Sequence, residues 1–124
     1  MAERLYRLEE ANALVPKLRP LLERIRDNHK TLAEDKTLAV VRQKASHNGG
    51  GLPGGHLAEV TKSLERDLGQ LQEWGIVLRD PRIGLIDFFH ERDGRTVFLC
   101  WKLGEAKVEW WHPLETGIAG RQRL

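Results

Sequence analysis

The hydrophobic pattern of the 124-residue chain changes its period once, at Gly75. Before this glycine, apolar residues recur three or four positions apart, which is the spacing of one face of an α-helix. After it, short runs alternate between apolar and polar residues, as half-buried β-strands do. We therefore predict an α+β fold, in which a long antiparallel helical hairpin is followed by a small antiparallel β-meander of three to four strands.

Residues 8–46 are predicted to form one long helix. Its apolar seam comprises Leu8, Ala11, Val15, Leu18, Leu22, Ile25, His29 and Leu32, at alternating spacings of three and four. Pro16 and Pro20 interrupt this pattern, and each removes a backbone donor from the helix. We expect a kink there, or a short first helix that restarts at Pro16.

A glycine-rich loop at residues 47–56 is predicted to connect this helix to a second one at residues 57–74. It is not a phosphate-binding P-loop, because no Gly-Lys pair follows the glycines. The apolar face of the second helix comprises Leu57, Val60, Leu64, Leu68, Leu71 and Trp74. Because the first helix is longer, part of its seam lacks an internal partner and is a candidate surface for homo-oligomer formation.

Residues 75–113 are predicted to form the meander. The pair Asp93-Gly94 predicts a two-residue hairpin turn, since both positions can take positive φ. Such a turn places Asp87 opposite Cys100 on one face of the sheet. The other face is more apolar and is expected to pack on the helices; it carries Ile86, Phe88, His90, Val97, Leu99 and Trp101.

The register of the next hairpin is open between two alternatives. A two-residue turn at residues 104–105 places Glu109 opposite Cys100 and leaves His112 on the apolar face. A three-residue turn places His112 opposite Phe98, on the face that carries Cys100. A shift of one residue therefore decides whether Cys100 and His112 can meet.

Four side chains of the predicted meander have the chemistry of metal ligands, namely Asp87, Cys100, Glu109 and His112. The spacing between the cysteine and the histidine matches no common zinc pattern. A catalytic Cys–His pair is disfavoured, because the charge of Asp87 opposes thiolate formation. The favoured interpretation is structural: Cys100 is a buried apolar residue, and Asp87 bonds the backbone or Arg121.

Composition narrows the partners and the setting. Twenty basic and 18 acidic residues give a net charge of +2, which argues against a nucleic-acid partner. No apolar run is long enough to cross a membrane, and the lone cysteine fits a reducing cytoplasm. The length favours a single domain over residues 1–124. In the C-terminal tail, residues 114–124, we expect Arg121 and Arg123 to be solvated, with pairing to a carboxylate as the alternative.

Two stretches of the chain resemble the DUF2203 family, small bacterial proteins of unknown function. They are LEEANALVPKLRPLLERI near the start and GIVLRDPRIGLIDFFHERDGRTVFLCWKLGEAKVEWWHPLETGIAGRQ near the end. The second stretch carries the motifs G-L-[IV]-D-F, D-G-R, L-C-W-[KR]-L-G-E, W-H and G-[FI]-A-G-R. The distinctive family residues fall on Asp80, Gly84, Asp87, Phe88, Cys100, Trp101, Gly104, Glu105, Trp111, His112, Gly117 and Arg121.

The chain departs from the family pattern at two positions, and the resemblance says little about function. The chain has Arg7 where the family usually has a hydroxyl residue, and Ile118 where phenylalanine is common. The resemblance implies a helical hairpin with a small sheet, in a bacterial cytoplasm. It implies no activity.

Two functional interpretations follow. The first is a non-enzymatic scaffold that self-associates through the first helix, uses the sheet as a second interface and needs no cofactor. The alternative is a small-ligand or metal-binding domain, open to catalysis and to a divalent metal, centred on Asp87, Cys100, His112 and Arg121. The candidate polar network joins Trp101, Glu105 and Trp111 to these four residues.

Overall fold

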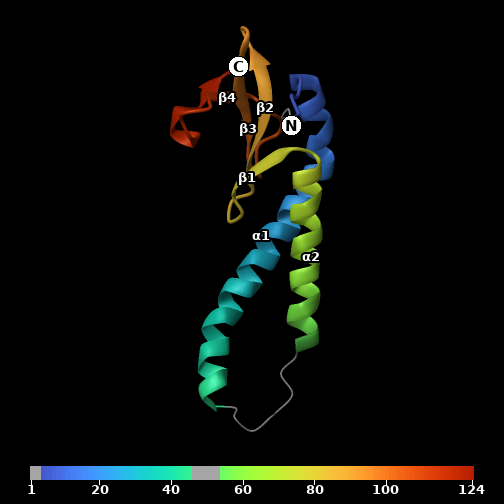
Figure 1. Ribbon diagram of the computed structural model, residues 1–124, viewed down its shortest axis with the longest axis vertical. Helices are drawn as coiled ribbons and strands as arrows, with labels where there is room; N and C mark the ends of the chain where they lie inside the picture. The colour runs from blue at the N-terminus through green and yellow to red at the C-terminus, as the bar shows by residue number, and fades with distance from the viewer. Residues whose placement is uncertain (1–3, 46–53) are drawn as a thin grey trace.

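The computed structural model describes the backbone of residues 4–45 and 54–124, and the side chains of residues 4–34 and 56–124. Two helices precede five antiparallel strands, so the predicted α+β class is confirmed (Figure 1). The helices are α1 (Leu8–Ala45) and α2 (Gly54–Glu73), and the strands are β1 (Ile76–Asp80), β2 (Leu85–Arg92), β3 (Arg95–Trp101), β4 (Trp110–Pro113) and β5 (Gln122–Arg123). A 3-10 turn, η1 (Ile118–Gly120), precedes β5. Within the described residues, no helix is long and apolar enough to cross a membrane.

The first helix, α1, begins at Leu8 as predicted and continues through Pro16 and Pro20. The alternative that the helix restarts at Pro16 is therefore wrong. At its start, the Arg7 amide donates to Glu10 Oε1 at 2.8 Å, which is one half of a capping box. This bond satisfies a backbone donor although Arg7 lacks the usual capping hydroxyl.

The second helix, α2, starts three residues earlier than the predicted 57, at Gly54, and ends before Gly75, whose φ of 71° is typical of a helix C-cap. It contacts α1 through a bidentate pair between Arg24 and Asp67, with N–O distances of 3.0 and 3.1 Å. The Asn28 amide also donates to the Ser63 hydroxyl at 3.2 Å. These pairs show that the helices run in opposite directions where they touch.

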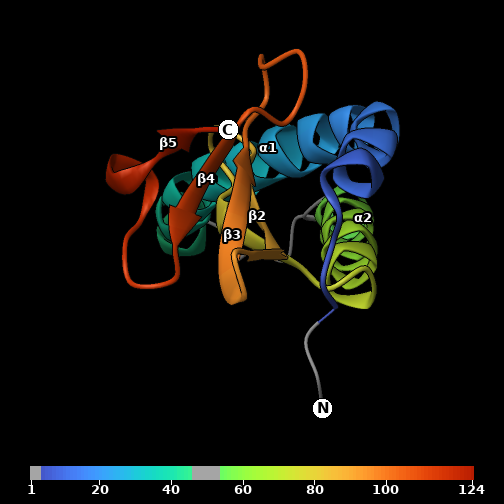
Figure 2. The same ribbon diagram turned by 90° about the horizontal axis from the view of Figure 1, so that it is seen from above.

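The strands form one sheet in the order β1-β2-β3-β4-β5. The predicted count of three to four strands is therefore wrong, because the fifth strand lies in the segment predicted to be a tail. Two backbone pairings, Trp110 with Arg123 and Trp111 with Gln122, attach β5 to β4. Figure 2 shows α2 on one side of the strands and this C-terminal segment on the other.

The register of the first predicted hairpin is confirmed. Asp93 and Gly94 have φ of 51° and 77°, and Asp87 pairs with Cys100. In the next hairpin, His112 pairs with Phe98, so the second of the two alternatives is correct. The connection itself is wider than predicted, because residues 102–109 lie between the strands. Eight residues replace the two or three that either turn assumed.

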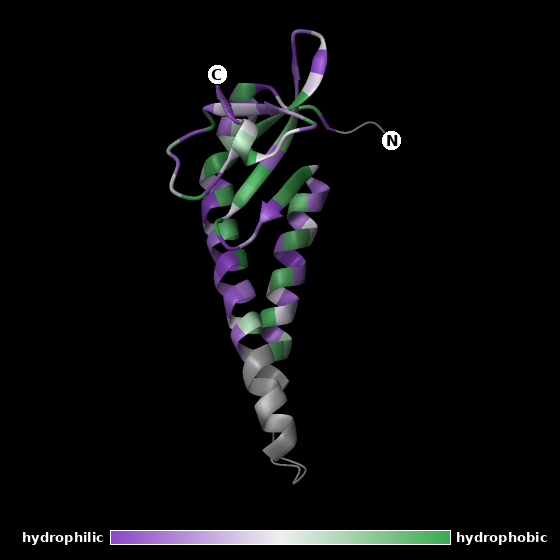
Figure 3. Ribbon diagram, turned by 90° about the vertical axis from the view of Figure 1, so that its left-hand side faces the viewer, coloured by the Kyte–Doolittle hydropathy of each residue, from purple (hydrophilic) through white to green (hydrophobic). Residues whose placement is uncertain are grey.

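The core lies between one face of the sheet and the two helices. Figure 3 shows hydrophobic residues along the central strands and in stripes on the helices. The strand residues of this core are Ile76, Ile86, Phe88, Val97, Leu99, Trp101 and Trp111. The helix residues are Ala11, Val15, Leu18, Leu21, Leu22, Ile25 and Leu71. The predicted packing face is therefore correct, and the opposite face is left for polar chemistry.

Gly84 is the position in the β1–β2 turn where a side chain should cost most. Its φ is +62°, and an added Cβ would lie 2.5 Å from Leu103 Cγ. We expect Gly84→Ala to lower the free energy of unfolding by about 2–4 kcal/mol in a urea titration. The matched control is Gly69→Ala in α2, where nothing lies within 4 Å of the added Cβ. That change should stabilise the helix by about 0.5–1 kcal/mol, and equal effects at both sites would contradict the steric argument.

Candidate functional site

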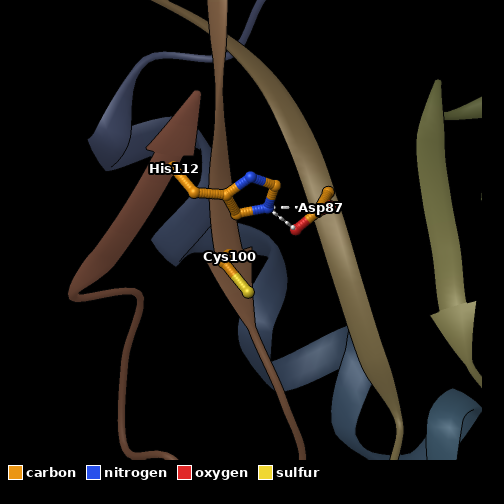
Figure 4. Close-up of side chains that lie close together, drawn as sticks. All are labelled: Asp87, Cys100 and His112. Atoms are coloured by element: carbon orange, nitrogen blue, oxygen red, sulfur yellow. Dashed lines mark hydrogen bonds and ion pairs between the residues drawn. The ribbon is translucent and has the colours of Figure 1, made fainter. Parts of the chain in front are cut away.

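Three neighbouring strands each contribute one buried polar side chain to a single cluster. Asp87 lies on β2, Cys100 on β3 and His112 on β4, and each is 1% exposed. Figure 4 shows the three side chains pointing toward one another. One carboxylate oxygen, the thiol sulfur and one ring nitrogen all lie within 4.8 Å of each other. We call Asp87, Cys100 and His112 the Asp–Cys–His cluster.

Both ring nitrogens of His112 have an oxygen partner. Nδ1 lies 2.8 Å from the carbonyl oxygen of Pro113, and Nε2 lies 3.1 Å from both Oδ atoms of Asp87. A carbonyl oxygen only accepts hydrogen bonds, so Nδ1 must donate to it. This bond fixes the ring orientation and leaves Nε2 directed at Asp87.

Asp87 has a second partner, the charged side chain of Arg79, which the sequence interpretation missed. Arg79 on β1 donates from Nε to Oδ2 at 2.7 Å, and its guanidinium lies 4.8 Å from the centre of the Phe98 ring. The predicted partner of Asp87, Arg121, is not among the side chains that bond it. Val77 pairs with Asp87, but the register of β1 shifts between Leu78 and Asp80, so the sequence pattern gave no clear signal that Arg79 would reach Asp87.

Burial and its neighbours make Cys100 a poor nucleophile. Burial and then the negative charge of Asp87 are the two largest causes that raise the pKa of its thiol from 9.0 to about 12, and the hydrogen bond that Asp87 accepts from the thiol adds to them. The positive charge of Arg121 lowers this pKa, but by less than burial or the Asp87 charge raises it. The expectation that Asp87 opposes thiolate formation is therefore confirmed.

An open pocket of about 400 Å³ lies over the Asp–Cys–His cluster. The cluster and Arg79 form part of its lining, together with Asp80, Leu85 and the residues 114–118 that follow β4. Leu114 and Ile118 in this segment are 44% and 41% exposed. The buried cluster is therefore reached from a pocket whose remaining walls are partly apolar.

The other predicted site residues form a second network, beside the loop at residues 102–109. Arg121 Nη2 donates to both carboxylate oxygens of Glu105, at 2.7 and 2.8 Å. Glu105 also accepts from the Lys102 amide through its carboxylate and from the Trp101 indole through its carbonyl. The expectation that Arg121 is solvated is therefore wrong, because its side chain is only 12% exposed.

Two further predicted residues take separate places. Trp111 is 9% exposed and packs into the core, with the guanidinium of Arg92 4.6 Å from its ring centre. Glu109, the fourth candidate metal ligand, pairs with Arg123 at 3.2 Å. It does not belong to the Asp–Cys–His cluster, which is the one metal-type group found among the described residues.

Comparison with known proteins identifies a family and no closer relative. The model of DUF2203, described as an uncharacterized conserved protein, matches residues 4–124. Neither the curated proteins nor the solved structures provide a match. The matched range contains the whole sheet and the Asp–Cys–His cluster, as well as both helices. The chain therefore belongs to the DUF2203 family.

Proposed function

We propose that the protein binds a divalent metal ion of the zinc type through Asp87, Cys100 and His112. The observation that carries this proposal is the convergence of three metal-ligating atoms within 4.8 Å, at the base of an open pocket. Imidazole, thiolate and carboxylate are the three ligand groups that Zn²⁺ takes in proteins. The three ligands come from adjacent paired strands, which hold them on a rigid support.

The geometry needs only a small adjustment to accept the ion. In a tetrahedral zinc site with bonds of about 2.0–2.3 Å, ligand atoms lie roughly 3.3–3.6 Å apart. The imidazole–carboxylate distance of 3.1 Å is already close to that value. A separation of up to 4.8 Å within the cluster requires a movement of about 1 Å, which a side-chain rotation supplies.

Groups around the ligands support the same interpretation. The Pro113 carbonyl holds the His112 ring by its Nδ1, which is the usual way in which a protein presents Nε2 to a metal. Arg79 bonds Oδ2 of Asp87 and does not contact Oδ1, which lies 3.1 Å from the other proposed ligand, Nε2 of His112. One effect opposes binding: the ion must displace the thiol proton, and burial together with the Asp87 charge raises the pKa of Cys100 to about 12.

The number of ligands bears on what the site does. Structural zinc sites are closed by four protein ligands, whereas catalytic sites use three and leave a position for water or substrate. The Asp–Cys–His cluster supplies three ligands, and the pocket lies over them. The site therefore has the form of one that binds or activates a small molecule at the metal.

Cobalt provides the direct test, because Co²⁺ occupies zinc sites and its bond to a thiolate absorbs light. We expect the chain to bind one Co²⁺ with a sulfur-to-metal absorption band. Cys100→Ala should abolish that band, and His112→Ala should weaken binding by about ten- to a hundredfold or more. The matched control is Glu109→Ala, which removes a carboxylate outside the cluster and should bind normally. The proposal would be refuted if the chain bound no cobalt. It would also be refuted if Cys100→Ala and His112→Ala both bound cobalt as the wild type does.

Self-association through the first helix stays a prediction, as does the helical hairpin that would support it. From Ala11 to Ile25 the seam is buried inside the molecule. The last two residues of the seam, His29 and Leu32, are half-buried, and the side chains of the rest of α1, residues 35–45, lie outside the described residues. Sedimentation of the full chain tests it: a monomer at micromolar concentration would exclude a stable helical dimer.

A further inference from the structure

Arg79 lies beside the proposed metal site, and most of its N–H donors have no acceptor among the described residues. Its side chain is 43% exposed and forms part of the pocket lining. A guanidinium has five N–H donors, and within residues 4–34 and 56–124 its one acceptor is Asp87, reached through Nε. The bond to Asp87 and the contact with the Phe98 ring fix the position of the remaining donors.

We propose that this pocket binds a small carboxylate that carries an apolar group. One carboxylate oxygen occupies the open position on the metal, and the other accepts hydrogen bonds from Arg79. This inference rests on the proposed metal site and names the class of ligand that the site takes. A metal and a fixed guanidinium on either side of a carboxylate are complementary to its charge and to its forked shape.

The size and the walls of the pocket fit the apolar part of such a ligand. A volume of about 400 Å³ lies in the range of small-molecule sites. Leu114 and Ile118 line the pocket and leave more than two-fifths of their surface exposed to water. A bound apolar group would cover that surface, which inorganic anions such as phosphate cannot do.

Two other carboxylates, Asp80 and Glu115, line the pocket, and their negative charges oppose the binding of an anion. Asp80 accepts from the Arg82 side chain at 2.9 and 3.1 Å, so its charge is already compensated. Glu115 lies on an exposed segment, where water and salt screen its charge. The negative charge of Glu115 should weaken carboxylate binding slightly. Removing it should therefore affect carboxylate binding in the opposite direction to removing the charge of Arg79.

The experiment uses the full chain loaded with Co²⁺ and benzoate as the probe. We expect benzoate to change the cobalt spectrum in a saturable way. Arg79→Gln should weaken benzoate binding about tenfold or more, because a charged hydrogen bond is lost. Glu115→Gln should bind benzoate equally or more tightly. Arg79→Lys, which keeps the charge and loses the fork, should lie between wild type and Arg79→Gln.

The cobalt stoichiometry of every variant is measured first, so that two failures can be told apart. If no variant and no wild-type chain binds cobalt, the metal site and this inference both fall. If cobalt binds and benzoate leaves its spectrum unchanged, the metal site stands and the carboxylate inference is overturned. Tighter binding of phosphate than of benzoate, or equal benzoate binding by wild type and Arg79→Gln, would also overturn it.

Discussion

Replacing His112 with alanine is expected to lower the free energy of unfolding by about 3–5 kcal/mol. The change removes a buried partner of Asp87, whose side chain is 2% exposed. Arg79 remains as a partner, but it is 43% exposed and approaches only one carboxylate oxygen. The loss also leaves a cavity beside Phe98, whose ring centre lies 5.3 Å from that of His112. A urea titration with a chelator present measures the effect without a metal.

A double-mutant cycle separates the polar interaction from the cavity. If the pairing dominates, Asp87→Asn and His112→Ala should be strongly non-additive, because either change alone disrupts the same pair. The matched control is the exposed pair of Arg26 and Asp27, where Arg26→Ala should change the free energy of unfolding far less than His112→Ala does, because water screens the pair. A loss below 1 kcal/mol for His112→Ala would contradict the view that the Asp–Cys–His cluster is important for stability.

The part of the site that the sequence predicted depends on one short turn. Asp93 and Gly94 both take positive φ, so the two-residue turn fixes the pairing of Asp87 with Cys100. Strand alternation then separates the core face from the polar face. These are local rules, and they need no knowledge of the rest of the molecule.

The position of His112 could not be predicted by the same rules. Its strand follows a connection of eight residues, at 102–109, and no turn type sets the register across such a length. The loop is held instead by hydrogen bonds to the Glu105 side chain, one of them from a distant part of the chain. Glu105 accepts from the Lys102 amide, and Arg121, from the far end of the chain, holds the Glu105 carboxylate.

Arg79 and the fifth strand were missed for a related reason. Arg79 reaches Asp87 from a strand whose pairing is shifted between Leu78 and Asp80, and a bulge of this kind has no clear sequence signal. The two residues of β5 are too few to produce an alternating pattern. Long-range ion pairs and irregular strands are therefore the part of this site that only the structure provides.

The same three side chains of the Asp–Cys–His cluster can stabilise the sheet without metal and can bind a metal ion, for one physical reason. Buried polar groups in a small sheet destabilise it unless each has a partner. Without metal, the His112 ring and the Cys100 thiol both lie against the Asp87 carboxylate. A divalent ion at the same place would replace the thiol proton and satisfy all three groups at once.

Alkylation of Cys100 by iodoacetamide at pH 8 is expected to be at least about thirtyfold slower in the folded chain than in the unfolded one. Its pKa rises from 9.0 to about 12, so the thiolate fraction falls about a thousandfold. The more basic thiolate is intrinsically more reactive, which recovers roughly twenty- to thirtyfold. Burial of the sulfur, with the residue 1% exposed, slows the reaction further. Mass spectrometry of the modified chain, with a chelator present, measures both rates.

The pH dependence of that rate identifies its cause. Because the folded pKa is raised, the folded rate should climb about tenfold per pH unit between pH 8 and 11, while the unfolded rate levels off above pH 9. Asp87→Asn removes a charge that raises the pKa of Cys100 and should speed the folded reaction at pH 8. Asp80→Asn, in the same pocket, should change that rate much less, since Asp80 is not among the groups that shift this pKa. A folded rate that levels off near pH 9 would show an ordinary thiol, and the barrier to metal binding that we attribute to its proton would disappear.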